Sequence, residues 1–234
     1  KNLGDVPFTM EYFDGSMYEM VEEIGKKYPN YVAFDFMGRS TTYRELLRNV
    51  EQCAKSLSML GIRENDKVTI AMPNCPQAIY MFYAINLIGA VSNMVHPLSS
   101  EKELEFYINE SESMTVVTLD QFYHKFEAIR ANTCAKNIII ARIRDALSQP
   151  LRWGYMLTEG RKIEKIPSDA PVIFWDDFLK FGKTRFFDIK VKRKSDDPAT
   201  ILYSGGTTGV TKGILLTNKN FNALATQIIA TNPM

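Results

Sequence analysis

The chain has 234 residues, of which 45% are hydrophobic and 24% are charged, and its formal net charge is +1. This composition is typical of a globular protein with a sizeable core in one or two domains. The small net charge argues against nucleic-acid binding, which normally takes a large basic excess.

Long apolar runs and metal-binding patterns are missing from the sequence. There is no stretch of about 18 apolar residues to span a bilayer and no apolar signal-peptide core. Cys53, Cys75 and Cys134 are odd in number and widely spaced, with only His96 and His124 to join them in a metal site. We therefore expect a cytoplasmic protein with reduced, mostly buried cysteines and no zinc site. His96 follows an apolar run with no carboxylate or nucleophile near it, so we expect it to shape a strand end.

Two capping boxes open the first predicted helices. Ser16 with Glu19, and Thr42 with Glu45, place a hydroxyl and a carboxylate three residues apart. This pattern satisfies free N–H groups in the first turn of a helix. The second of these helices should be the longer one and should end at Gly61, because glycine is favoured just after a helix.

Short apolar runs in the first half predict strands. They cover residues 31–36, 67–72, 91–98, 114–119 and 137–141. Helices are predicted over residues 76–88, with Asn74 as N-cap and Gln77 closing the box, and over residues 100–110. Because strands alternate with helices, residues 1–144 are predicted to form an α/β wound subdomain with a largely parallel, helix-covered sheet.

Residues 145–195 are predicted to form an irregular connection, because proline and glycine break the pattern there. Trp153 and Trp175 should pack beneath it. The basic run at residues 190–194 is interpreted as a solvated face, since acidic residues 196–197 follow it at once. A phosphate-facing patch is the alternative.

A loop of small residues lies between two apolar runs, 201–203 and 214–216, and carries the clearest chemistry. Both runs are short enough to be buried strands, and a helix should begin near Asn218. The glycines let consecutive N–H groups turn toward one anion, the hydroxyls add neutral donors, and a lysine adds positive charge. These residues are Ser204, Gly205, Gly206, Thr207, Thr208, Gly209 and Lys212.

Polyphosphate binding is the interpretation favoured for this loop. A glycine-rich hairpin without a ligand would need only one or two special residues, whereas here three hydroxyls and a lysine crowd together. A P-loop is disfavoured, because Lys212 is preceded by Thr211 and followed by Gly213 and a strand pattern.

Residues 203–213, with the sequence YSGGTTGVTKG, resemble the signature loop of the acyl-adenylate-forming enzymes: acyl-CoA synthetases, luciferases and peptide-synthetase adenylation domains. Residues 197–199 and 216–221 are similar to the flanks of that loop. Thr211 and Asn218 depart from the family pattern, which usually has proline and often histidine there. The missing proline should leave the far side of the loop freer when no ligand is bound.

The resemblance implies the N-terminal part of the acetyl-CoA synthetase-like fold, with residues 196–234 as the nucleotide-loop hairpin and the helix after it. It implies that ATP activates a carboxylic acid, with a fatty acid the leading candidate, and that CoA then receives the acyl group. Lys212 and Thr207 are implied to be catalytic, and Ser204 to Gly209 with Lys212 to bind ATP. Mg²⁺ would have ligands partly outside this chain. A patch facing CoA is the alternative for residues 190–194.

The sequence ends at Met234, before the family's adenine segment, ribose-binding aspartate and C-terminal-domain lysine. We therefore expect residues 1–234 to be an incomplete AMP-binding domain that folds without completing adenylation. An incomplete sheet should expose apolar surface and favour self-association. Two alternatives stay open: a fragment of a peptide-synthetase adenylation domain, and a naturally short, non-catalytic nucleotide-binding protein.

Overall fold

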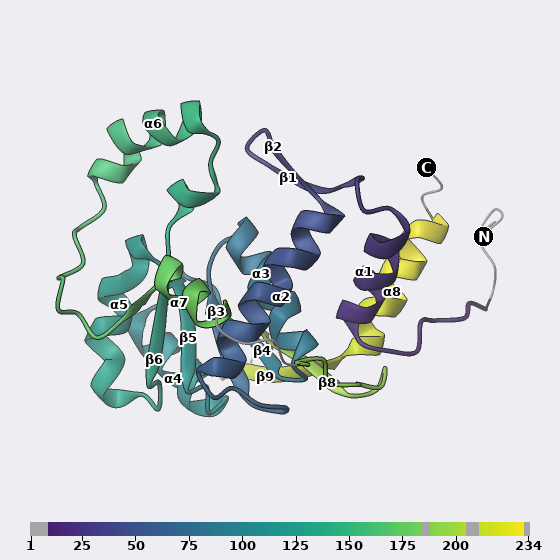
Figure 1. The fold of residues 1–234 in the computed structure, drawn as a ribbon. Coiled ribbons are helices and arrows are strands. Elements are labelled where there is room, and N and C mark those ends of the chain that lie inside the picture. The colour runs from purple at the N-terminus through teal and green to yellow at the C-terminus, as the bar shows by residue number, and fades with distance from the viewer. Residues whose placement is uncertain (1–8, 184–187, 205–210, 232–234) are drawn as a thin grey trace.

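The computed structural model describes residues 9–183, 188–204 and 211–231, and its centre is a twisted sheet (Figure 1). The strands of this sheet are β3 (Lys67–Ala71), β4 (Val91–Met94), β5 (Thr115–Leu119), β6 (Asn137–Ala141), β7 (Ile173–Phe174), β8 (Pro198–Ser204) and β9 (Lys212–Thr217). Their order is β7-β6-β5-β3-β4-β8-β9. All pairs among β3 to β8 are parallel, and β9 is antiparallel to β8. The prediction of a largely parallel sheet is confirmed.

Helices cover both faces of this sheet. The α-helices of the described residues, of which α6 does not cover the sheet, are α1 (Met17–Lys27), α2 (Tyr43–Met59), α3 (Pro76–Leu87), α4 (Glu101–Glu110), α5 (Tyr123–Ile129), α6 (Gln149–Leu157), α7 (Trp175–Phe181) and α8 (Asn218–Thr231). Successive strand residues face opposite sides. Val117 and Ile139 belong to the core formed with α2, α3 and α7, whereas Val116 and Ile138 belong to the core formed with α4 and α5. The predicted α/β fold class is therefore confirmed.

Local signals placed the early helices correctly. Ser16, Thr42 and Ser100 each form a complete capping box at the start of α1, α2 and α4. Gly61 follows the C-cap residue Leu60 of α2 and has φ +91°, a conformation that glycine adopts without strain. The predicted strand at 31–36 is found as β1 (Val32–Phe36), which pairs with β2 (Arg39–Thr42) in a separate antiparallel hairpin.

The prediction for the start of α3 is wrong. Its N-cap is Cys75, without a side-chain cap, and Pro76 occupies the first turn. Because proline has no N–H, one donor that a capping side chain would satisfy is absent. The buried Gln77 does not close a capping box, and its Nε2 donates instead to the Arg142 carbonyl oxygen at 3.0 Å. The strand β4 also ends at Met94, earlier than predicted.

The connection from β6 to β8 differs from the predictions at several side chains. Trp175 is buried, but Trp153 is 65% exposed, because α6 stands away from the sheet and its covering helices (Figure 1). The basic run is not wholly solvated, since Arg193 is buried and lies 2.7 Å from Glu64.

The cysteines were predicted to be mostly buried. Cys53 and Cys75 are buried, whereas Cys134 is exposed.

The last two strands of the sheet have different surroundings. The run 201–203, predicted to be a buried strand, lies in the second half of β8, where Ile201 and Tyr203 are half-buried and Leu202 is 39% exposed, whereas Ala199 and Thr200 before it are buried. On β9, Ile214 and Leu215 are 46% and 55% exposed. The prediction of a buried second strand is wrong, because β9 is the last strand of the described sheet and has only β8 beside it. The helix predicted near Asn218 begins there as α8. None of the helices in the described ranges is long and apolar enough to cross a membrane.

Candidate functional site

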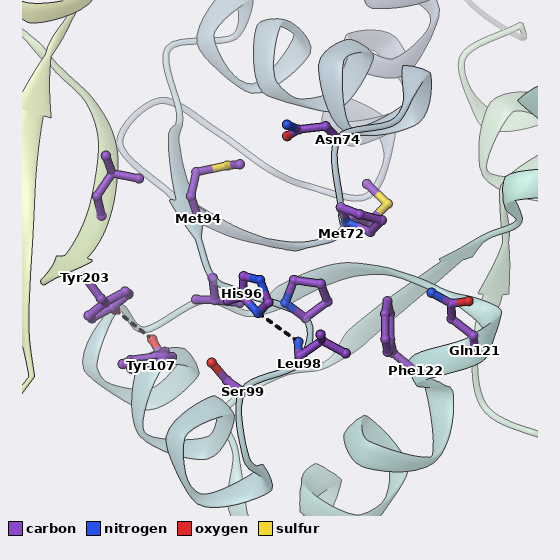
Figure 2. A pocket seen from close by; sticks show the side chains of 14 residues that line it. Met72, Asn74, Met94, His96, Leu98, Ser99, Tyr107, Gln121, Phe122 and Tyr203 are labelled. Atoms are coloured by element: carbon purple, nitrogen blue, oxygen red, sulfur yellow. Dashed lines mark hydrogen bonds between the residues drawn. The ribbon is translucent and has the colours of Figure 1, made fainter. Parts of the chain in front are cut away.

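A cavity of about 1040 Å³ opens at the carboxyl ends of the parallel strands (Figure 2). Its lining comes from the segments that follow β3, β4 and β5, from α4, and from the end of β8. The lining residues are Met72, Pro73, Asn74, Met94, Val95, His96, Pro97, Leu98, Ser99, Tyr107, Gln121, Phe122, Leu202 and Tyr203. Most of these side chains are apolar, with a few polar groups among them, the usual make-up of a small-molecule site.

The order of the strands explains why the cavity lies here. From the central strand β3 the chain passes through α3 to β4 on one side, and then through α4 to β5 on the other side of β3. The helices α3 and α4 belong to the cores on opposite faces of the sheet. The connections that leave the neighbouring strands β3 and β5 therefore run in opposite directions. The carboxyl ends of two such strands form the topological switch point, where open α/β sheets bind ligands.

Tyr107 and Tyr203 form one wall of the cavity. Their ring centroids are 4.0 Å apart, and the Tyr203 hydroxyl donates to the Tyr107 carbonyl oxygen at 3.2 Å (Figure 2). Burial raises the pKa of the Tyr203 phenol to about 12, and the negative charge of Glu110 acts in the same direction. The phenol is therefore neutral at physiological pH and fixes the end of β8 against α4.

A buried amide supports this wall from below. Asn93 Nδ2 donates to Thr69 Oγ1 at 2.9 Å, to Ser111 Oγ at 2.8 Å and to the Tyr107 carbonyl oxygen at 3.2 Å. These bonds join β3, β4 and α4 directly beneath the cavity. The Tyr107 carbonyl oxygen also accepts from the Tyr203 hydroxyl, so Asn93 and Tyr203 share this one acceptor.

His96 also lines the cavity, on the segment that follows β4 and leads to Leu98 and Ser99 (Figure 2). Its Nδ1 accepts a hydrogen bond from the Leu98 N–H at 3.2 Å, and its carbonyl oxygen accepts from the Ser99 N–H at 3.0 Å. These contacts turn the chain after β4, in agreement with the predicted role in shaping a strand end.

The two ends of the predicted phosphate loop stand beside this cavity. Ser204, the last residue of β8, is in register with Lys212, the first residue of β9. Tyr203, next to Ser204, lines the cavity. Lys212 is exposed and forms no ion pair with any residue in the described ranges. The predicted site residues Gly205, Gly206, Thr207, Thr208 and Gly209 lie outside the described residues.

Sequence analysis missed most of the cavity. Asn74 was interpreted as a helix cap, and no role was predicted for Tyr107 or Phe122, which all line it. One signal was available: Met72 to Asn74 and Gln121 to Phe122 follow buried strands directly, and the carboxyl ends of parallel strands meet at one edge of a sheet.

A metal centre is not assembled by the described side chains. They contain no group of three or more histidine, cysteine, aspartate or glutamate residues suited to hold a metal ion. These residues therefore do not supply a complete Mg²⁺ site.

Comparison with known proteins identifies the family. Residues 21–233 match the family model described as "AMP-binding enzyme". The chain therefore belongs to the AMP-binding enzyme family, which confirms the resemblance in the loop sequence.

The curated relatives include fatty-acid ligases. The long-chain-fatty-acid–CoA ligase of Bacillus subtilis is 26% identical over 220 residues, covering 94% of this chain and 39% of that protein. The chain thus spans about two fifths of the length of that relative.

Solved structures share the fold. The structure of the anthranilate CoA ligase AuaEII in complex with anthranoyl-AMP has a TM-score of 0.74 at 19% identity, covering 97% of this chain and 38% of that one. A long-chain-fatty-acid-CoA ligase from Archaeoglobus fulgidus has a TM-score of 0.73 at 22% identity, covering 95% and 40%. These likenesses confirm the adenylate-forming fold.

Proposed function

We propose that this chain provides the ATP-phosphate loop and part of the substrate crevice of an AMP-forming carboxylate–CoA ligase, with a fatty acid as the acid. The observation that carries the proposal is the pairing of Ser204 with Lys212 beside the cavity at the switch point of the sheet. The names of the curated relatives, long-chain-fatty-acid–CoA ligases, support the choice of acid.

The loop would act through charge and position. Ser204 contributes a hydroxyl at one end and Lys212 an ammonium group at the other. Between them, Gly205, Gly206 and Gly209 would let the backbone N–H groups face the phosphates, and Thr207 and Thr208 would add hydroxyl donors. Donors fixed in advance around the β- and γ-phosphates stabilise the charge that gathers on departing pyrophosphate.

The reaction we propose has two steps. A carboxylate oxygen attacks the α-phosphorus of ATP, the bond from that phosphorus to the bridging oxygen breaks, and acyl-adenylate and pyrophosphate form. The sulfur of CoA then attacks the acyl carbon, the bond from that carbon to the AMP oxygen breaks, and the thiol proton passes to solvent. Positioning both reactants against one bound nucleotide supplies much of the acceleration.

The cavity supports an organic ligand next to the phosphates. Its volume of about 1040 Å³ suits a small-molecule substrate, and Met72, Met94 and Phe122 give it apolar walls. Met94 is unbranched and can adapt its shape to the ligand.

The test is ATP–pyrophosphate exchange by the product of the complete gene, with a long-chain fatty acid. We expect Lys212→Gln to lower kcat/KM by about a hundredfold, the scale found when one charge-stabilising donor is lost. Lys219→Gln is the matched control, since Lys219 is also exposed and begins α8 outside the loop. Equal activity of the two variants would refute the role of the loop.

The chain of 234 residues should bind ATP without completing adenylation, because it spans 39% of the length of the Bacillus subtilis relative. Exchange of labelled pyrophosphate into ATP by the purified chain, with any fatty or aryl acid, would contradict this part of the proposal.

A further inference from the structure

A second cavity, of about 530 Å³, lies at the carboxyl ends of β5, β6 and β7. This second cavity is separate from the first cavity, which we proposed as part of the substrate site. The short 3₁₀ helix Asp120–Phe122 divides the two, because Asp120 lines the second cavity whereas Gln121 and Phe122 line the first. Residues 160–166 provide the outer wall.

The lining of this cavity is strongly cationic. Arg142 and Arg144 follow β6, and Arg161 and Lys165 come from the outer wall. Arg142, Arg161 and Lys165 form no ion pair with any residue that the structure describes. Arg161 and Lys165 are exposed and Arg142 is half-buried, so their donors are open to a ligand that enters the cavity.

Arg144 has an unmet hydrogen-bond donor. Its Nε is buried and has no hydrogen-bond partner among the described residues. The carboxylate oxygen Asp145 Oδ1 is 3.9 Å from this nitrogen, too far for a hydrogen bond. A buried donor without a partner is unfavourable, so its presence calls for an acceptor from outside the chain.

The position of Arg142 is fixed by contacts that leave its N–H groups available. Its guanidinium carbon lies 4.8 Å from the centre of the Phe174 ring, a cation–π contact. Its carbonyl oxygen accepts from Gln77 on α3. The guanidinium is therefore held in place without using its donors.

The two acids in the lining offset these cations only in part. Burial raises the pKa of the Asp120 carboxyl, and the positive charges of Arg142 and Arg144 act against that rise. Glu164 Oε2 is 3.1 Å from His124 Nε2, a contact that is an ion pair only when the histidine is protonated. Asp120 is the other acid, and it forms no ion pair with a described residue. The lining thus has four cationic side chains and two carboxylates, which leaves an excess of positive charge.

We propose that this cavity binds a ligand with two adjacent phosphate groups, held by Arg142 and Arg144 from the strand ends and by Arg161 and Lys165 from the outer wall. Guanidinium groups bind phosphate oxygens in pairs, and a diphosphate would supply acceptors to the unpaired donors. Free pyrophosphate and the diphosphate of a nucleotide share this chemistry. The inference does not depend on the loop at residues 204–212.

The test is calorimetric titration of the purified chain with pyrophosphate at about 0.15 M ionic strength, where non-specific attraction to surface charge is screened. All variants carry Lys212→Gln, so that the loop contributes little. We expect Arg144→Gln and Lys165→Gln each to raise the Kd by about tenfold, the effect of losing one charge-assisted hydrogen bond. Lys162→Gln is the matched control, because Lys162 lies in the same segment but pairs with Glu159 at 2.7 Å and is not in the lining.

A parallel titration with ADP distinguishes the source of the diphosphate. Tighter binding of ADP than of pyrophosphate, lost in Arg144→Gln, assigns the cavity to a nucleotide. Tighter binding of pyrophosphate assigns it to the free anion. Absence of binding in the Lys212→Gln background, or equal binding by Arg144→Gln and Lys162→Gln, would overturn the proposal without affecting the ligase assignment.

Discussion

Asn86 Nδ2 donates to Asn218 Oδ1 at 2.8 Å, and both side chains are almost fully buried. The same Asn218 oxygen accepts from the Met17 N–H at 3.1 Å, and its Nδ2 donates to the carbonyl oxygens of Lys194 and Asp197 at 3.2 and 3.3 Å. One amide at the start of α8 therefore ties together α1, α3 and the segment before β8. Asn218 therefore has a structural role.

Asn218→Ala should destabilise the chain by about 3 kcal/mol, because it leaves buried donors and acceptors on α1, α3 and the segment before β8 without partners. The measurement is the midpoint and slope of urea unfolding. Asn30→Ala is the control, since Asn30 is exposed and its side chain forms no hydrogen bond with a described residue. Equal stability of both variants would contradict a structural role for Asn218.

Arg193→Met should cost about 2 kcal/mol of unfolding free energy. The Arg193 side chain is 5% exposed, and its Nη1 lies 2.7 Å from Glu64 Oε1 and 3.0 Å from Asn65 Oδ1. Removing it leaves a partly solvated carboxylate and an amide without their donor. Lys192→Met, at the exposed neighbouring position, should change the stability little. A larger loss in Lys192→Met than in Arg193→Met would show that the basic run is held by other contacts.

The Tyr203 phenol should make stability depend on alkaline pH. Burial raises its pKa from about 10 to about 12, so the unfolded chain loses this proton at a lower pH than the folded chain. Its contribution is therefore complete below pH 10 and falls as the pH rises from about 10 to about 12. Tyr203→Phe should cost about 1 kcal/mol at neutral pH through the lost hydrogen bond to Tyr107, and should make the alkaline decline shallower.

The control for that measurement is Tyr31→Phe, because Tyr31 is 66% exposed. Denaturant unfolding at several pH values gives the slope for each variant. If the unfolding free energy of Tyr203→Phe falls with alkaline pH as steeply as that of the unmodified chain, a buried, neutral Tyr203 is contradicted.

The exposed edge strand β9 should cause self-association. Ile214 and Leu215 are 46% and 55% exposed on a strand that has a partner on one side only in the described sheet. Such an edge can pair with another chain. Light scattering should detect concentration-dependent dimers or larger species, and Leu215→Lys should reduce them more than Leu157→Lys, which changes an equally exposed leucine on α6. A clean monomer at high concentration would show that the edge stays unpaired.

Much of the fold could be predicted from local sequence because its signals are local. A capping box needs only residues three apart, so Ser16, Thr42 and Ser100 marked helix starts correctly. Strand order is different, because it depends on which face each crossover helix covers, and that is decided by packing between distant segments. Arg193 was misjudged for the same reason, since its partner Glu64 is 129 residues away.

The candidate site could be predicted only in part. The loop at residues 204–212 is identified by its own composition, because glycines, hydroxyls and a lysine gather within a short stretch of sequence. The crevice beside it brings together residues such as Tyr107 and Tyr203, which are 96 positions apart. Tyr203 begins the loop motif, but Tyr107 belongs to no local motif. Only the sheet topology, which makes β4 the neighbour of β8, places them in one wall.

The central claim is that the loop between Ser204 and Lys212 holds the phosphates of ATP, and calorimetric ATP binding by the chain tests it most directly. The variants Lys212→Gln and Lys219→Gln are compared in an Arg144→Gln background, so that the second cavity contributes little. We predict that ATP binds, that Lys212→Gln raises the Kd by about tenfold or more, and that Lys219→Gln leaves it unchanged. Failure to bind ATP, or equal Kd values for the two lysine variants, would contradict the account.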